Sequence, residues 1–241
     1  MTNRFFCDDI DANKAHLSLQ ESQHCIKVLR LKQGENIKLL DGKGNLYEGI
    51  IQEPNPKKSI IKIINKKSYE KRKLNLTVCF SPPKSIDRLE WFVEKAVEIG
   101  IEEIFFMKCS RSERKNINME RIEKKAISAL KQSGNKYLPR LHELKPLKDI
   151  LSLLNDHQSQ KYLAHLMSGR TSTLKDLMGL EQEHFTIMIG PEGDFTDSEL
   201  ELCLNHNFRG LSLGDSVLRT ETAAVHICSF VAIKNELKGP Q

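Results

Sequence analysis

Two consecutive strand–turn–helix patterns in residues 184–225 constrain the fold of this chain more than any other feature. The first begins with residues 185–190, an apolar run of strand length, and turns sharply at residues 191–195. Thr196 and Glu199 follow with the spacing of a capping box, so a helix is expected to begin here. Strand, helix and strand in this order indicate a parallel α/β sheet.

The second pattern repeats the plan. Residues 210–213 end a strand, residues 214–220 form a loop, and a helix is expected from about Glu221, with Ala224 and Ile227 on its apolar face. Loops at the carboxyl ends of neighbouring strands are where open α/β sheets bind ligands, and the glycines in both loops allow close approach of the backbone. The alternative, ordinary strand-to-helix connections without a ligand, stays open at this point.

The residues of these two loops resemble a known family. Residues 189–193 read Ile-Gly-Pro-Glu-Gly, and residues 213–224 read Leu-Gly-Asp-Ser-Val-Leu-Arg-Thr-Glu-Thr-Ala-Ala. This pair is similar to the signature of the 16S ribosomal RNA uracil-N3 methyltransferases, which belong to the SPOUT class. The resemblance implies an α/β fold with a C-terminal trefoil knot that holds S-adenosylmethionine. It also implies a homodimer and a target uridine in small-subunit ribosomal RNA, near the decoding site.

The composition is typical of a globular protein of one or two domains. Among 241 residues, 39% are hydrophobic and 29% charged, and no window approaches 18 uninterrupted apolar residues. The first residues lack the apolar core of a signal peptide, so we expect a cytoplasmic protein without a membrane span. The six cysteines form no C-x-x-C pair and the eight histidines show no paired ligand spacing, which favours buried free thiols and no metal.

The positive charge is unevenly distributed. Residues 1–73 hold 15 Lys and Arg against 9 Asp and Glu, a balance of +6, whereas the remaining residues hold 22 against 23, a balance of −1. A second basic stretch, residues 111–136, carries 8 Lys and Arg against 3 Glu. Clustered positive charge indicates a polyanionic partner such as RNA. A solvated lysine-rich surface is the alternative.

Residues 1–70 predict a small β domain with one short helix. The elements expected are a helical stripe through Cys25, Val28 and Leu29, strands at 36–40, 46–51 and 59–64, a hairpin turn at 41–44, and a polar linker at 65–73. This order resembles the PUA-like RNA-binding β-barrel domain that opens the same methyltransferase family. The likeness lies in Arg4, Phe5, Phe6, His24, residues 27–30, Asp41 and Gly42. By this resemblance Arg4, Lys27 and Arg30 are expected to hold RNA phosphates.

Residues 74–241 predict the α/β domain. The elements expected before the two signature loops are strands at 74–80, 104–109 and 160–165 and helices at 86–99, 119–132 and 147–154. Residues 94–100 again look like the family's pattern. No G-x-G-x-x-G follows a strand and no phosphate-binding G-x-x-x-x-G-K motif occurs, so dinucleotide and P-loop readings lose their main support.

Three positions depart from the usual family sequence. Lys131 and Lys136 stand where the family has an acidic residue and an arginine, and Leu166 stands where a proline usually follows the histidine equivalent to His165. The lysines put in doubt any role that needs that acid or a bidentate guanidinium. His165 remains an expected cofactor-loop residue, with a histidine that merely closes a strand as the alternative.

The resemblance also indicates roles for the site residues. Methylation at N3 requires that nitrogen to lose its proton and the methyl group to travel in line from sulfur, so the protein mainly positions groups and balances charge. Arg219 is expected to stabilise negative charge on the uracil oxygens, and Glu221 or Glu192 to orient the base or the cofactor. The alternative is that Thr220 and Glu221 simply cap the last helix. The expected cofactor contacts are Ala164, His165, Ile189, Gly190, Pro191, Glu192, Gly193, Leu213, Gly214, Val217, Leu218, Arg219, Thr220 and Thr222, and the further RNA contacts are Lys84, Arg111, Arg114 and Lys136.

Two other functions compete with this one. A non-catalytic RNA-binding module of the same fold would use no cofactor, so S-adenosylmethionine binding separates it from an enzyme. A small-molecule α/β enzyme that uses another nucleotide would have to explain the basic N-terminal third and the missing phosphate loop.

Overall fold

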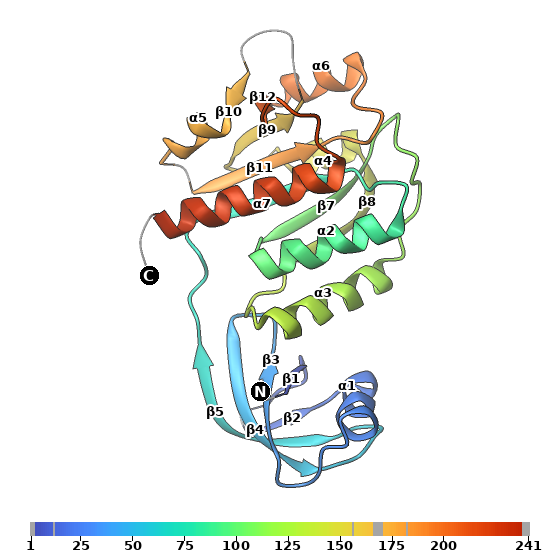
Figure 1. Ribbon diagram of the computed structural model, residues 1–241, viewed down its shortest axis with the longest axis vertical. Helices are drawn as coiled ribbons and strands as arrows, with labels where there is room; N and C mark the ends of the chain where they lie inside the picture. Colours follow the sequence, from blue (N-terminus) through green and yellow to red (C-terminus); the bar gives the residue numbers. More distant parts are fainter. Residues whose placement is uncertain (1–2, 12, 156, 166–170, 182, 238–241) are drawn as a thin grey trace. The chain divides into compact units, whose positions relative to one another are not determined.

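The computed structural model describes residues 3–11, 13–155, 157–165, 171–181 and 183–237. They form two compact units, one of residues 1–71 with 127–138 and the other of residues 72–126 with 139–241. Figure 1 labels the elements of both units. Helix α3 (Met119–Ser133) has residues in each unit.

The first unit is built on a curled five-stranded sheet in the order β1-β3-β4-β5-β2. Its strands are β1 (Arg4–Phe6), β2 (Lys14–His16), β3 (Asn36–Leu40), β4 (Asn45–Glu53) and β5 (Ile60–Ser68). β1 runs parallel to β3, and the other pairs are antiparallel. Over the described residues the edge strands β1 and β2 do not pair with each other, so the sheet is half of a barrel. Helix α1 (Leu19–Gln23), the π-helical turn η1 (His24–Val28) and residues 127–138, which include the end of α3, complete the unit.

The predicted hairpin of the first unit is confirmed. The Asp41 carboxylate accepts hydrogen bonds from the amides of Lys43 and Asn45 at 2.8 and 3.1 Å, and Gly42 and Gly44 take positive φ values of 69° and 99°. Aspartate at the start of a tight turn and glycine at positive φ are what this turn chemistry requires.

Two expectations for the first unit are wrong. Cys25 is buried and Leu29 packs on the core, but Val28 is 66% exposed, so the predicted helical stripe does not include it. The expected linker at 65–73 begins later, because β5 continues to Ser68 and pairs with the first residues of the long strand β4. Exposed lysines in this part of β5 give no apolar alternation, so the sequence carried no strand signal there.

The unusual lysine at position 131 has a structural partner in the first unit. Its ammonium lies 2.6 Å from the carboxylate of Glu21, and both side chains are mostly buried. Arg4 Nη1 donates hydrogen bonds to the carbonyl oxygens of Lys131 and Gln132, each at 3.1 Å, at the end of α3. The charge at position 131 therefore pairs with α1. Leu166, another of the three departures from the family sequence, lies outside the described residues.

The second unit contains a seven-stranded, all-parallel sheet in the order β10-β12-β9-β11-β6-β7-β8. The strands are β6 (Asn75–Phe80), β7 (Glu103–Lys108), β8 (Arg140–Pro146), β9 (Gln160–Ala164), β10 (Ser172–Thr173), β11 (His184–Ile189) and β12 (Arg209–Ser212). After β8 the chain returns to the other side of β6, so the strand order reverses there. Open α/β sheets bind ligands at such a reversal.

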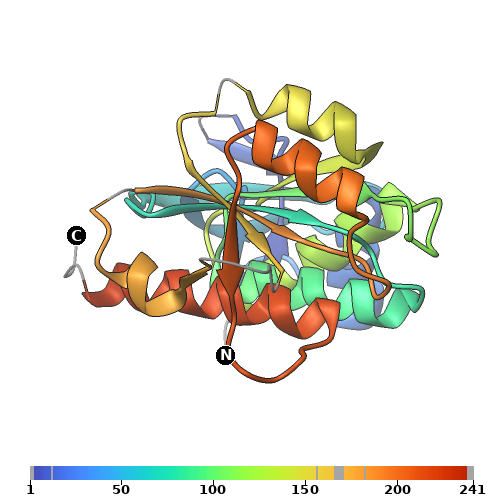
Figure 2. The same ribbon diagram turned by 90° about the horizontal axis from the view of Figure 1, so that it is seen from above.

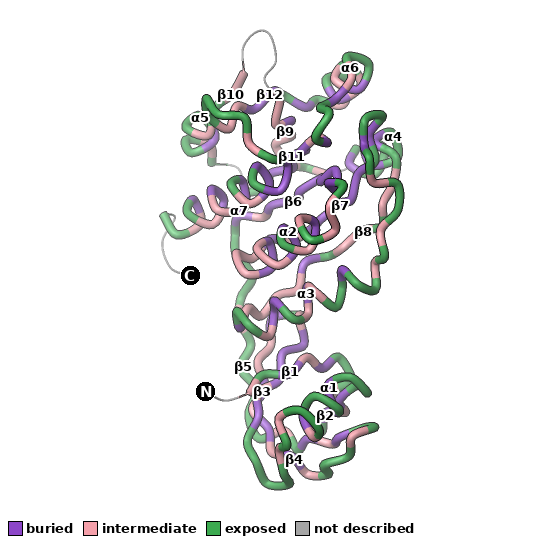
Figure 3. Tube along the Cα trace, turned by 45° about the vertical axis from the view of Figure 1, so that its right-hand side comes forward, coloured by how far each residue is buried: buried purple, intermediate pink, exposed green. Residues whose placement is uncertain are grey.

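Helices cover both faces of this sheet, as Figure 2 shows. One face carries α2 (Ile86–Ile99), α5 (Leu174–Met178) and α7 (Thr220–Leu237), and the other carries α4 (Leu147–Leu153) and α6 (Asp197–Asn205). Phe80 of β6 stacks on Phe92 of α2 with ring centroids 4.2 Å apart. On the opposite face Met188, Cys203 and Phe208 share one apolar cluster with α4. Figure 3 shows the central strands buried, as expected when helices cover both faces.

The predicted α/β class and most of its elements are confirmed. Helix α2 has the expected bounds and ends at Gly100, which takes φ 88°. Both capping-box hydrogen bonds between Thr196 and Glu199 are present at the start of α6. The sequence analysis missed β8, β10 and α5. β8 is an edge strand without buried alternation, and β10 has only two residues, so neither gives a clear periodic signal.

All six cysteines are buried and free, as expected, and burial raises the pKa of the Cys25 thiol to about 11. Within the described residues, no helix combines the length and apolar character that a membrane crossing requires. The same residues hold no group of three or more His, Cys, Asp or Glu side chains placed to bind a metal ion.

Candidate active site

A cavity opens where three neighbouring strands of the second unit end. The register places Ala164 of β9 beside both Ile189 of β11 and Leu211 of β12, so the carboxyl ends of the three strands meet in one row. The cavity has a volume of about 480 Å³, within the usual range for small-molecule sites. It is lined by Ala164, His165, Ile189, Gly190, Pro191, Glu192, Asp194, Leu211, Leu213, Gly214, Ser216, Val217, Leu218, Arg219, Thr220 and Ala223.

The structure brings together nearly all the residues predicted to contact the cofactor. Only Gly193 and Thr222 of that set do not line the cavity. The backbone at Gly193 packs against Arg111, whose side chain donates a hydrogen bond to the Gly193 carbonyl oxygen at 3.0 Å, and Thr222 is exposed on α7. Sequence reasoning missed Asp194, Leu211, Ser216 and Ala223. Each lies within one or two residues of a predicted contact, so this closeness in sequence was the signal that could have identified them.

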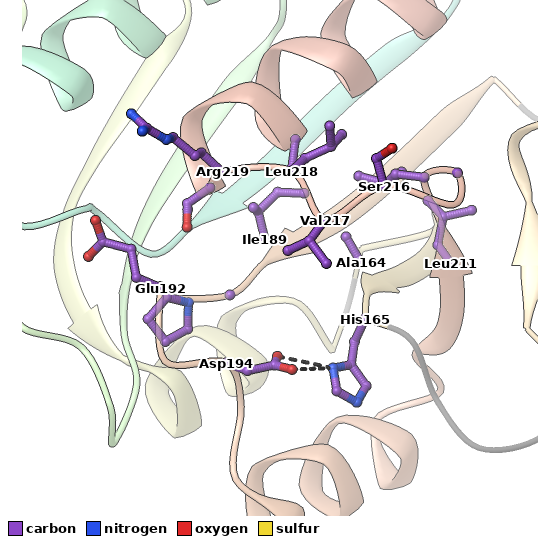
Figure 4. Close-up of a pocket in the computed structure, with 16 residues that line it drawn as sticks. Ala164, His165, Ile189, Glu192, Asp194, Leu211, Ser216, Val217, Leu218 and Arg219 are labelled. Carbon is purple, nitrogen blue, oxygen red and sulfur yellow. Dashed lines mark hydrogen bonds and ion pairs between the residues drawn. The ribbon is translucent and has the colours of Figure 1, made fainter.

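The two ends of the cavity differ in character, as Figure 4 shows. Ala164, Ile189, Leu211 and Val217 form an apolar wall that runs from the middle of the cavity to one end. Val217 is 93% exposed although it is apolar, so a bound ring would remove its side chain from water. The Glu192 carboxylate and the Arg219 guanidinium lie at the other end.

The first signature loop is a tight turn fixed by Asp194. Its amide donates to the Pro191 carbonyl oxygen at 2.9 Å, its φ is 59°, and its carboxylate accepts from the Phe195 amide at 2.8 Å. The same carboxylate lies 2.8 Å from Nδ1 of His165, so the residue that follows β9 is joined to the loop that follows β11. The histidine predicted for the cofactor loop is thus held in place by an acid that the sequence analysis did not single out.

An arginine from α2 joins the two acidic residues predicted for catalysis. Arg88 Nη1 lies 3.5 Å from Glu192 Oε1, and Arg88 Nε lies 3.5 Å from Glu221 Oε1. Glu192 lines the cavity, whereas the Glu221 side chain is only 8% exposed in the first turn of α7. Arg88 gave no signal in the sequence, because its position beside the two loops depends on how α2 packs on the sheet.

Three of the residues predicted to bind RNA gather around the first signature loop. The amide of Lys84 donates to Glu192 Oε2 at 3.3 Å, Arg111 binds the carbonyl oxygen of Gly193, and Arg114 donates to the carbonyl oxygens of residues 83 and 84. The ammonium of Lys84 lies 2.9 Å from Glu113, which raises the pKa of that lysine. Lys84 and Arg111 therefore contact the first signature loop directly, and Arg114 contacts the backbone next to Lys84.

The other four predicted RNA contacts belong to the first unit. Lys27 and Arg30 are exposed at the end of η1, and Arg30 adopts φ 55°. Arg4 is exposed and contacts the last carbonyl oxygens of α3, and the ammonium of Lys136 lies 5.0 Å from the ring centroid of Tyr69.

Comparison with known proteins decides the family. A model described as the RNA methyltransferase domain matches residues 70–232, more than half of the chain. The chain belongs to the RNA methyltransferase family. A second model, the RNA methyltransferase PUA domain, matches residues 18–64 of this RNA methyltransferase. Its first unit is thus similar to a PUA domain, as the resemblance implied.

Curated relatives cover most of this RNA methyltransferase. A ribosomal RNA small subunit methyltransferase E of Rickettsia conorii is 29% identical, over 88% of this chain and 87% of the relative. Ribosomal RNA small subunit methyltransferase E 1 of Borreliella burgdorferi is 28% identical, over 92% of this chain and 94% of the relative.

Solved structures support the same assignment. A probable rRNA-methyltransferase from Porphyromonas gingivalis is 30% identical, with a TM-score of 0.87 over 98% of this RNA methyltransferase and 100% of that chain. A Legionella pneumophila protein, described as a methyltransferase in complex with the bound cofactor SAM, is 26% identical. Its TM-score is 0.83, over 96% of this chain and 97% of that chain.

Proposed function

We propose that this RNA methyltransferase transfers a methyl group from S-adenosylmethionine to N3 of one uridine in small-subunit ribosomal RNA, near the decoding site. The observation that carries the proposal is the single cavity that both signature loops line, at the carboxyl ends of three neighbouring parallel strands. The names of the curated relatives support small-subunit ribosomal RNA as the substrate. The SAM complex of the Legionella pneumophila relative supports S-adenosylmethionine as the cofactor.

The residues present fit S-adenosylmethionine. The apolar wall with the exposed Val217 side chain suits the flat adenine ring, and the Glu192 carboxylate suits the positive charge of the sulfonium. In the described part of the chain, the amides of Ser216, Val217 and Leu218 donate to no protein acceptor, so they are available to the edge of the ring. Gly214, at φ 119°, has no heavy atom within 4 Å of where a Cβ would be, which leaves that backbone open to a ligand.

The side chains at the polar end define the proposed mechanism. When bound, S-adenosylmethionine supplies an electrophilic methyl group on a positively charged sulfur. Arg219 would stabilise the negative charge that develops on the uracil oxygens as N3 releases its proton to solvent, because a guanidinium stays protonated and offers paired donors. Glu192, which lines the cavity, orients the bound groups, and Glu221 acts from its buried position through Arg88.

In this proposal the basic residues bind the phosphate backbone of the RNA. Residues 1–70 act as the RNA-binding domain, with Arg4, Lys27 and Arg30 on phosphates, and residues 74–241 act as the catalytic domain. Lys84, Arg111 and Arg114 of the second unit and Lys136 of the first unit bind further phosphates, and the target uridine leaves its stack and enters the cavity. Affinity for RNA should then fall steeply with salt, because each neutralised phosphate releases counterions.

We further propose a trefoil knot and a homodimer, working in the cytoplasm. Support for the knot comes from the chain path: β12 pairs with β9, yet α7 contacts α2, β6 and β11, so residues 213–219 have to cross the ends of the sheet. Support for the dimer comes from α7, where Ile233 and Leu237 are 53% and 72% exposed. Light scattering in solution tests the dimer, and a monomer at micromolar concentration would refute it.

Two measurements in sequence test the function. Isothermal titration with S-adenosylmethionine should show one saturable site, and no binding would leave the non-catalytic RNA-binding module as the better reading. Radiolabelled methyl transfer should then be measured on small subunits and on free 16S RNA that lack the modification. Label recovered as N3-methyluridine is expected, and label on another base, or none, would refute the assignment.

A further inference from the structure

Arg88 is a single cation shared by two carboxylates on two different loops. It reaches Glu192 in the first signature loop and Glu221 at the start of α7, with both N–O distances at 3.5 Å. In the described chain no other side-chain cation lies within ion-pair distance of either acid. The second oxygen of Glu221 is buried without a hydrogen-bond partner, so Arg88 is its main electrostatic compensation.

A second arginine, Arg219, lies at the same end of the cavity, and its side chain is unpaired among the described residues. Arg219 lines the cavity, and Figure 4 shows its guanidinium near the end where the Glu192 carboxylate lies. Within the described residues, the Arg219 side chain makes no hydrogen bond and no ion pair. Arg88 is therefore paired with both acids, and Arg219 is paired with neither.

We propose that Arg88 is a positioning residue, which holds Glu192 and Glu221 and thereby leaves the Arg219 guanidinium free to meet the substrate base. This inference rests on the proposed function. A guanidinium satisfied by a neighbouring carboxylate has to break that pair before it can stabilise new negative charge. Because Glu192 and Glu221 are already paired with Arg88, they do not compete for Arg219. The Arg219 guanidinium is therefore available when the uridine arrives.

The test compares Arg88→Gln with a matched control on the same helix. Lys95→Gln is the control, because Lys95 also contacts two carboxylates, those of Glu94 and Glu98 at 3.0 and 2.9 Å, but lies away from the cavity. Arg88→Gln should lower kcat about tenfold or more while the Kd for S-adenosylmethionine stays within about threefold. Lys95→Gln should leave both unchanged. Arg88→Lys, which keeps the charge, should recover a large part of the lost kcat.

A crystal structure of Arg88→Gln provides a readout that does not depend on activity. It should show Arg219 within ion-pair distance of Glu192 or Glu221. The proposal is overturned if Arg219 stays unpaired, if kcat is unchanged, or if the main effect is weaker cofactor binding. A wild-type protein that transfers no methyl group would instead refute the proposed function, and the position of Arg219 in the variant would still decide the pairing.

Discussion

Substituting Gly190 by alanine should disturb the cofactor site through packing alone. A Cβ at this position would lie 2.6 Å from Cε2 and 3.0 Å from Cδ2 of Phe195. Ordinary carbon contacts are about 3.5–4.0 Å, so the ring would have to retreat by about 1 Å. Phe195 is 3% exposed and belongs to the apolar cluster with Met188 and Phe208, so it has little room to move.

The expected cost follows from that geometry. Overpacking of a closed core destabilises by about 1–3 kcal/mol, which corresponds to a thermal midpoint lower by about 2–12 °C for a chain of this size. Part of the strain should be relieved by displacing residues 191–195, which carry Glu192 and Asp194. If about 1.4 kcal/mol is relieved in this way, S-adenosylmethionine binds about tenfold more weakly.

Thermal unfolding and isothermal titration on Gly190→Ala measure the two effects. Gly179→Ala is the matched control, since the nearest atom to its Cβ is an oxygen of Asp176 at 3.8 Å, an ordinary contact, and the residue is exposed. The control should stay within about 0.5 kcal/mol of wild type. If Gly190→Ala matched the control in both stability and affinity, the reasoning from Phe195 would be wrong.

Three further predictions concern the site and its support. Arg219→Ala should lower methyl transfer at least tenfold with the unfolding midpoint unchanged, and activity within tenfold of wild type would remove Arg219 from the mechanism. Lys234→Met should destabilise by about 2–4 kcal/mol in urea unfolding, because the buried ammonium donates to the carbonyl oxygens of residues 177, 178 and 180 at 2.6–2.8 Å. A loss below about 0.5 kcal/mol would contradict this role. Burial raises the pKa of the Glu199 carboxyl, but hydrogen bonds from Thr196 and Ser110 outweigh it and hold the pKa below its ordinary value. The free energy of unfolding of wild type should therefore exceed that of Glu199→Gln in full above about pH 4.3. This excess should be lost as the pH falls through the lower pKa that Glu199 has in the folded protein, and a pH-independent difference would refute the prediction.

The sequence predicted those parts of the fold that depend on local chemistry. The capping box at Thr196 and Glu199 and the helix end at Gly100 are confirmed because a few neighbouring residues determine each. The signature loops came from resemblance, and the cavity they share depends on strand order, which places β11 between β9 and β6. No local pattern encodes that order.

The parts that the sequence could not predict depend on contacts between distant residues. Arg88 matters because the packing of α2 brings it to Glu192 and Glu221, which lie more than a hundred residues further along the chain. The pairing of Lys131 with Glu21 is equally distant. A charged residue on a helix has the same appearance in sequence whether it faces solvent or a partner.

The most direct test of the central claim is nucleoside mass spectrometry of small-subunit ribosomal RNA from cells with and without this protein. N3-methyluridine should be present in the first, absent in the second, and restored by the wild-type chain but not by Arg219→Ala. Unchanged N3-methyluridine after removal of the protein would contradict the claim, as would loss of a methyl group from any other base.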